Sequence, residues 1–152
     1  MATKVIIDTG PLVAFLNSTD TMHGWSVDQF SELTPPFLTC ESVLSEVCFL
    51  LRRFHQGTEA LFQLLERELI QLRFNMESET TAVQQLMKKY SDLPMSLADA
   101  CLVRMSEQIS DSVVCTLDTD FKIYRKEQRK VLPVIMPMAR INKQLVTSSY
   151  IL

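Results

Sequence analysis

The chain has 152 residues, of which 47 % are hydrophobic and 22 % are charged, as expected for one soluble globular domain. Its net charge of −3 argues against binding nucleic acid through bulk positive charge, but not against a nuclease whose clustered acids bind cations. The apolar runs are far shorter than the ~20 residues that cross a bilayer, and the start lacks a signal-peptide pattern. We therefore expect a cytoplasmic protein without a membrane partner.

The cysteines show no CxxC spacing and lie among apolar neighbours, which predicts buried, reduced thiols. With only two histidines, the chain offers little for a zinc site built from nitrogen and sulfur ligands. A site for a metal ion that prefers oxygen ligands remains possible.

Strands and helices are predicted to alternate along the chain, from β-branched runs on one hand and apolar residues at helical spacing on the other. In chain order we expect a strand over 4–8, a helix over 22–33, a strand over 37–39, helices over 42–54 and 58–68 separated by Gly57, a strand over 70–74, a helix with its apolar face over 82–90, a helix over 96–106, a strand over 113–116, a short helix over 121–126 and a strand over 134–136. This alternation predicts an α/β three-layer sandwich with a central parallel sheet of four or five strands. The domain is expected to span 1–139, followed by a tail over 140–152.

Four acids lie where such sheets place their sites, at the carboxyl ends of strands or near the starts of helices. Asp8 closes the first strand, Asp118 follows the strand over 113–116, and Asp99 lies in the first turn of the helix that opens at Ser96. Glu46 is the only acid in the strongly apolar helix over 42–54.

Each acid also has a simpler explanation. Asp8 and Asp118 could form local turns, Asp99 could cap its helix together with Ser96, and Glu46 could be a surface residue. If all four converge, however, their repulsion calls for a compensating cation, and Mg²⁺ prefers oxygen ligands of this kind.

Four segments, VIIDTGPLVAFL, LSEVCFLL, LPMSLADACLV and TLDTDF, occur in this order and carry the four acids. As an ordered set they resemble the PIN-domain family, and they look most like the VapC-type toxins of bacterial toxin-antitoxin modules. The resemblance implies that Asp8, Glu46, Asp99 and Asp118 hold Mg²⁺ or Mn²⁺, with Asp120 as a candidate fifth acid. It also implies RNA cleavage by water that leaves a 3′-hydroxyl and a 5′-phosphate, an antitoxin partner and a homodimer.

Within that reading, Asp8 and Asp99 are the closest ligands, Asp118 serves a second ion or a bridging water, and Glu46 orients water or assists metal binding. Thr9 and Thr116 are suitable hydroxyl partners for these acids. The helical pair over 42–68 is the expected dimer face.

The basic stretch over 121–130 either grips a phosphate backbone or is a solvated helix face. Arg52 and Arg53 are candidates for the same task, or simply cations favoured at the end of a helix.

Two other functions fit parts of the pattern. One is a PIN fold that binds RNA or acts as a scaffold with little cleavage. The other is a phosphoryl-transfer fold, either a response-regulator receiver or a haloacid-dehalogenase-like phosphatase. It fits less well, because Phe74 and Asn75 follow the third strand and Gly10 stands two residues after Asp8.

Overall fold

The computed structural model describes residues 3–140 and 150–151. At its centre is a five-stranded parallel sheet in the order β3-β2-β1-β4-β7. Its strands are β1 Lys4–Ile7, β2 Phe37–Thr39, β3 Ile70–Leu72, β4 Ser112–Cys115 and β7 Val134–Ile135. The predicted parallel sheet is therefore confirmed, at the upper end of the expected strand number.

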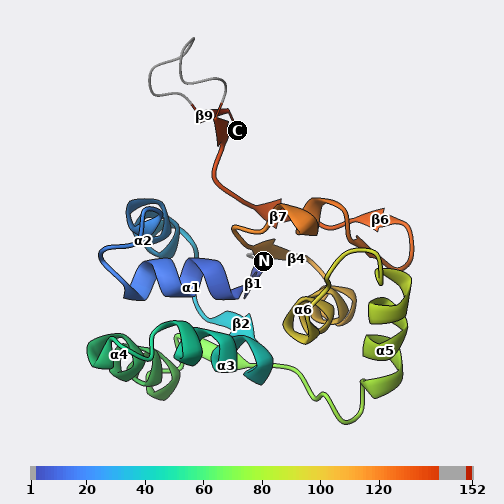
Figure 1. Ribbon diagram of the computed structural model, residues 1–152, viewed down its shortest axis with the longest axis horizontal. Coiled ribbons are helices and arrows are strands. Elements are labelled where there is room, and N and C mark those ends of the chain that lie inside the picture. The colour runs from blue at the N-terminus through green and yellow to red at the C-terminus, as the bar shows by residue number, and fades with distance from the viewer. Residues whose placement is uncertain (1–2, 141–149, 152) are drawn as a thin grey trace.

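Six helices flank the sheet, with α1 to α4 grouped on one side of it and α5 and α6 on the other (Figure 1). Their bounds are α1 Thr9–Leu16, α2 His23–Glu32, α3 Glu41–Leu50, α4 His55–Glu66, α5 Thr80–Lys89 and α6 Leu97–Gln108. This arrangement confirms the predicted three-layer α/β architecture.

The strand order reverses at β1. The chain proceeds from β1 to β2 and β3 on one side, then returns to place β4 and β7 on the other. Val5 pairs with Phe37 in β2 and with Val113 in β4, so β1 is the central strand. In open parallel sheets, such a reversal leaves a crevice at the carboxyl ends of the two diverging strands, which here are β1 and β4.

The core forms around β1 and α6. Val5, Ile6 and Ile7 are all buried because helices cover both faces of the sheet. Helix α6 is buried along most of its length, from Ala98 to Ser106. The four cysteines are unpaired, and all but the half-buried Cys48 are buried, in agreement with the prediction of reduced thiols.

The boundary between α3 and α4 differs from the prediction. Helix α3 ends at Leu50 rather than at residue 54, and Gly57 lies inside α4 instead of separating two helices. A Cβ at Gly57 would lie 3.3 Å from the Leu51 side chain, so this glycine allows close packing of α4 on the preceding turn.

The prediction of a short helix over 121–126 is wrong. A 3₁₀ helix occupies Thr119–Lys122, and the chain then forms an antiparallel hairpin of β5 Arg125–Lys126 and β6 Lys130–Val131. Glu127 and Gln128 adopt φ values of 49° and 72°, which give the tight turn that the hairpin requires. The basic stretch is therefore not a solvated helix face.

Beyond β7, strand β8 Ala139–Arg140 pairs with β9 Tyr150–Ile151. The division into a domain over 1–139 and a tail over 140–152 stays a prediction, since most of that tail lies outside the described residues. Across the part of the chain that the structure describes, no helix has the length and apolar character to cross a membrane.

Candidate active site

Three of the four predicted acids, Asp8, Asp99 and Asp118, lie at a strand end or in the first turn of a helix, and Glu46 lies in the middle of α3. Asp8 directly follows β1 and is the N-cap of α1, where Oδ1 accepts a 2.7 Å hydrogen bond from the Thr9 amide. Asp118 follows β4 and caps the 3₁₀ helix by accepting from the Asp120 amide at 2.9 Å. Both predicted turn-forming roles are therefore real, and they fix the two carboxylates at neighbouring strand ends.

Thr116 joins these two strand ends. Its hydroxyl donates to Oδ2 of Asp8 at 2.7 Å and accepts from the Asp118 amide at 2.9 Å. The side chain is fully buried, and the ladder that pairs β1 with β4 continues to Asp8, whose amide donates to the Cys115 carbonyl. Thr116 thus holds the Asp8 carboxylate and the Asp118 backbone in one rigid unit.

Thr9 brings Glu46 to the same place. The Thr9 hydroxyl donates to Oε1 of Glu46 at 2.7 Å, which connects the first turn of α1 to the middle of α3. Gly10 lets the first turn of α1 lie close to the residue that follows Thr116, because a Cβ at Gly10 would lie 3.2 Å from the Leu117 side chain. Both threonines therefore contact predicted site acids, as their positions in the sequence suggested.

Asp99 has two roles. Its amide donates to the Ser96 hydroxyl at 3.0 Å, so the predicted N-cap of α6 is present. Its carboxylate accepts a hydrogen bond of 3.0 Å from the Tyr124 hydroxyl. The capping hydrogen bond therefore uses the Asp99 amide, and the carboxylate makes a separate contact with Tyr124.

Burial dominates the electrostatics of the group. Burial raises the pKa of Asp8 to about 7, the hydrogen bonds from Thr116 and Thr9 oppose this rise, and the charges of Asp99 and Asp118 add to it. Burial likewise raises the pKa of Asp99, with a further contribution from Asp118. The three aspartates are thus close enough for each to feel another's charge.

No lysine or arginine in the described part of the chain forms an ion pair with any of the four acids. Over residues 3–140, no three acidic, histidine or cysteine side chains lie close enough together to hold one ion as they stand. The donor set nevertheless suits a hard divalent cation, because it consists of carboxylate oxygens that repel one another and have no cationic partner.

Sequence reasoning missed Tyr124 as a neighbour of the acids. It is fully buried, and burial together with the nearby charges of Asp99, Asp120 and Asp118 raises the pKa of its hydroxyl. It lies in the stretch 121–130, where the basic residues were the visible signal. Nothing in the local sequence connects it to Asp99, which is 25 residues away.

Two further predicted residues are Arg52, a candidate phosphate contact, and Asp120, the candidate fifth acid. Arg52 stacks over the Phe49 ring at 4.1 Å and donates to the Phe49 carbonyl at 2.7 Å, so it caps the end of α3 as a cation favoured there. Asp120 is half-buried in the 3₁₀ helix, beside Asp118.

Comparisons with known proteins bear on the family and the fold of the chain. The family model described as PIN domain matches residues 5–127, which contain all four acids. No curated protein matches the chain. Among solved structures, the chain is similar to Mycobacterium tuberculosis VapC20, a toxin described as cleaving the sarcin-ricin loop. The TM-score is 0.68 at 20 % identity, over 86 % of this chain and 100 % of that one.

At that identity the likeness concerns the fold. The family match, by contrast, covers most of the chain and sets aside the receiver and phosphatase alternatives. The chain belongs to the PIN-domain family.

Proposed function

We propose that this protein is a Mg²⁺- or Mn²⁺-dependent endoribonuclease that hydrolyses RNA phosphodiester bonds with Asp8, Glu46, Asp99 and Asp118. The observation that carries the proposal is the group of acids at the reversal of strand order, where Asp8 and Asp99 are buried and Glu46 and Asp118 are half-buried. None of the four forms an ion pair with a described residue. Buried carboxylates without a cationic partner are costly, and they are retained where a bound ion compensates them. Membership of the PIN-domain family supports the same chemistry.

Each of the four acids would have its own role in the reaction. Asp8 and Asp99 would hold the cation, with Asp118 beside them for a second ion or a bridging water. When bound, the cation would neutralise the acids, polarise the phosphate and activate water. Glu46, whose carboxylate is held by Thr9, would orient the attacking water and accept its proton.

The direct test of metal dependence is cleavage of a structured RNA by the purified protein. We expect cleavage in Mg²⁺ or Mn²⁺, loss in excess EDTA, and recovery when the metal is restored above the chelator. The products should carry 5′-phosphates, which a 5′-phosphate-dependent exonuclease degrades. Cleavage that persists in EDTA would contradict the proposal.

We also propose that the protein is the toxin of a toxin-antitoxin module, acting on RNA in the cytoplasm and neutralised by an antitoxin protein. The similarity to VapC20 supports this proposal. Induced expression in bacteria should arrest growth, and expression of Asp8→Asn should not. Growth that is equally slow with both would point to a burden of expression instead.

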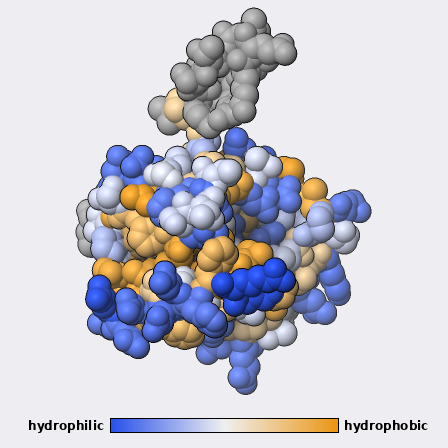
Figure 2. Space-filling view, turned by 60° about the vertical axis from the view of Figure 1, so that its left-hand side comes forward, coloured by the Kyte–Doolittle hydropathy of each residue, from blue (hydrophilic) through white to orange (hydrophobic). Residues whose placement is uncertain are grey.

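A homodimer is part of the proposal. Helices α3 and α4 expose large apolar side chains, and Figure 2, which brings the side with α1 to α4 forward, shows hydrophobic surface gathered there among hydrophilic residues. The exposed apolar residues on and between these helices are Phe49, Leu50, Phe54 and Phe62. Such a patch is typical of a surface that another protein covers.

One observation favours a second candidate function. Because no three of the described acids are close enough to hold one ion as they stand, a PIN fold that binds RNA with little cleavage is the alternative. A Mn²⁺ titration separates the two. Saturable binding that Asp8→Asn removes favours the nuclease, and no binding at millimolar metal favours the scaffold.

A further inference from the structure

We propose that Tyr124 is a positioning residue whose hydroxyl holds the Asp99 carboxylate in the orientation that receives the cation. This inference rests on the proposed function. It concerns a residue outside the four acids, and it gives the segment after the 3₁₀ helix a role in metal binding.

The contact is a buried hydrogen bond. The Tyr124 hydroxyl donates to Oδ2 of Asp99 at 3.0 Å, and both side chains are buried. The Tyr124 ring is held edge-on between two aromatic neighbours, with centroids 5.1 Å from Tyr90 and 5.2 Å from Phe121. Packing on both sides restricts the ring, and with it the direction in which the hydroxyl points.

The backbone that carries Tyr124 is anchored as well. On its N-terminal side, the Tyr124 amide donates to the Asp120 carbonyl at 3.1 Å. On its C-terminal side, the Arg125 amide donates to the Tyr90 hydroxyl at 2.8 Å. The donor and the carboxylate are therefore both parts of fixed structure.

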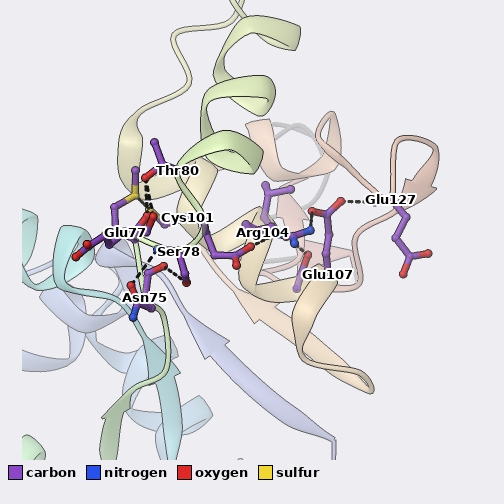
Figure 3. Close-up of polar contacts among 12 residues, drawn as sticks. Asn75, Glu77, Ser78, Thr80, Cys101, Arg104, Glu107 and Glu127 are labelled. Carbon is purple, nitrogen blue, oxygen red and sulfur yellow. Dashed lines mark hydrogen bonds and ion pairs between the residues drawn. The ribbon is translucent and has the colours of Figure 1, made fainter.

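The hairpin that follows is fixed to α6, the helix that carries Asp99. Figure 3 shows Glu107 of α6 between Arg104 and Glu127; the Glu127 amide donates to Glu107 at 2.5 Å and Arg104 forms an ion pair with it at 3.2 Å. The Lys126 ammonium adds a bond of 3.3 Å to the Ser106 carbonyl. These contacts keep the segment after Tyr124 on the same helix as its acceptor.

The chemistry of the donor suits a metal ligand. A lysine or arginine at this position would neutralise Asp99 and compete with a cation for it. A phenol hydroxyl is neutral, so it orients the carboxylate through Oδ2 and leaves its negative charge for the ion. Hydrogen bonds of this kind to metal ligands commonly change metal affinity by about 10- to 100-fold when they are removed.

The test compares Tyr124→Phe with wild type and with Ser112→Ala. Ser112→Ala is the control, because it removes a hydroxyl from a buried side chain at the start of β4, one that bonds the Ile109 carbonyl and no acid. Mn²⁺ affinity is measured by isothermal titration calorimetry on the full chain. RNA cleavage is then followed as a function of Mn²⁺ concentration.

We expect the Mn²⁺ dissociation constant to rise about 10-fold in Tyr124→Phe and to change less than 2-fold in Ser112→Ala. Cleavage by Tyr124→Phe at saturating Mn²⁺ should return to within a few-fold of wild type, because the bound ion then orients Asp99. If instability of a variant prevents calorimetry, the rise in unfolding temperature on adding Mn²⁺ gives the same comparison.

Wild-type Mn²⁺ affinity in Tyr124→Phe would overturn the inference, as would an equal loss of affinity in both variants, since that would indicate a general structural effect. Neither result would touch the proposed function. If the wild-type protein itself neither bound Mn²⁺ nor cut RNA, the proposed function would fail and this inference with it.

Discussion

The Thr116 hydroxyl donates a 2.7 Å hydrogen bond to the Asp8 carboxylate, although the two residues are 108 positions apart in the chain. The same hydroxyl accepts from the Asp118 amide. A single side chain at the end of β4 thus satisfies a buried carboxylate after β1 and a backbone donor in the following turn. The arrangement of the candidate site therefore depends on a residue that carries no charge.

Replacing Thr116 with Val should destabilise the protein by about 1–3 kcal/mol, because it leaves a buried acceptor and a donor without their partner. Urea unfolding at pH 7.5 measures the change. Thr119→Val is the control, since Thr119 is exposed and such surface changes stay within about 0.5 kcal/mol. Equal stability of the two variants would mean that the Thr116 bond contributes little.

The pKa of Asp8 predicts how stability depends on pH in the presence of EDTA. Burial raises that pKa from 3.8 to about 7. Below the lower value the carboxyl is protonated in both states and costs nothing. As the pH rises toward 7, the unfolded chain loses its proton first, so the folded state loses stability, by on the order of 4 kcal/mol once both are ionised.

Thermal unfolding at pH 5 and pH 8 in EDTA tests this prediction. Wild type should be less stable at pH 8, and Asp8→Asn should show a smaller difference, with a remainder from Asp99, whose pKa burial also raises. Added Mg²⁺ should stabilise wild type more at pH 8, where fewer protons have to leave. The same pH dependence in both proteins would exclude Asp8 as its source.

Glu46→Gln should lower the cleavage rate by about 10- to 100-fold while leaving stability nearly unchanged. Glutamine keeps the side-chain oxygen that accepts from Thr9 but loses the charge. Glu41→Gln provides the control, as Glu41 lies on the same helix and is exposed. Comparable rates for the two variants would remove Glu46 from the site.

If the exposed apolar side chains of α3 and α4 form the dimer interface, a charged residue introduced there should prevent dimerisation. Phe62 is 55 % exposed on α4, so Phe62→Glu should convert a dimer to a monomer in size-exclusion chromatography with light scattering. Val131→Glu introduces the same charge at a side chain that is 65 % exposed on the β5–β6 hairpin, and it should leave the dimer intact. A wild-type monomer at micromolar concentration would contradict the dimer.

Much of the fold could be predicted from periodicity, because each strand of the sheet is a short apolar run and each long helix has an apolar face. The hairpin after the 3₁₀ helix could not. The chain turns at Glu127 and Gln128, which adopt a left-handed conformation. Such turns usually contain glycine or asparagine, and this one contains neither, so nothing in the sequence indicated it. Each strand of the hairpin is so short that its sequence cannot be distinguished from that of a short charged helix, although Arg125 pairs with Val131 in the structure.

Asp8, Asp99 and Asp118 could be proposed from the sequence because strand ends and helix starts meet at one edge of a parallel sheet. Glu46, which lies inside α3, was proposed chiefly from the family resemblance. The contact between Tyr124 and Asp99 was not visible. It depends on how the 3₁₀ helix sets the tyrosine against α6, which is a matter of tertiary packing rather than of spacing.

The most direct test of the central claim is RNA cleavage in Mg²⁺ by Asp8→Asn and Asp99→Asn beside Asp111→Asn. Asp111 is exposed at the opposite end of β4, and its φ of 52° suits asparagine, so this control loses the same charge away from the site. We expect Asp111→Asn to cut RNA at the wild-type rate and the other two variants to show at least a 100-fold loss. Undiminished cleavage by folded Asp8→Asn and Asp99→Asn would contradict the account.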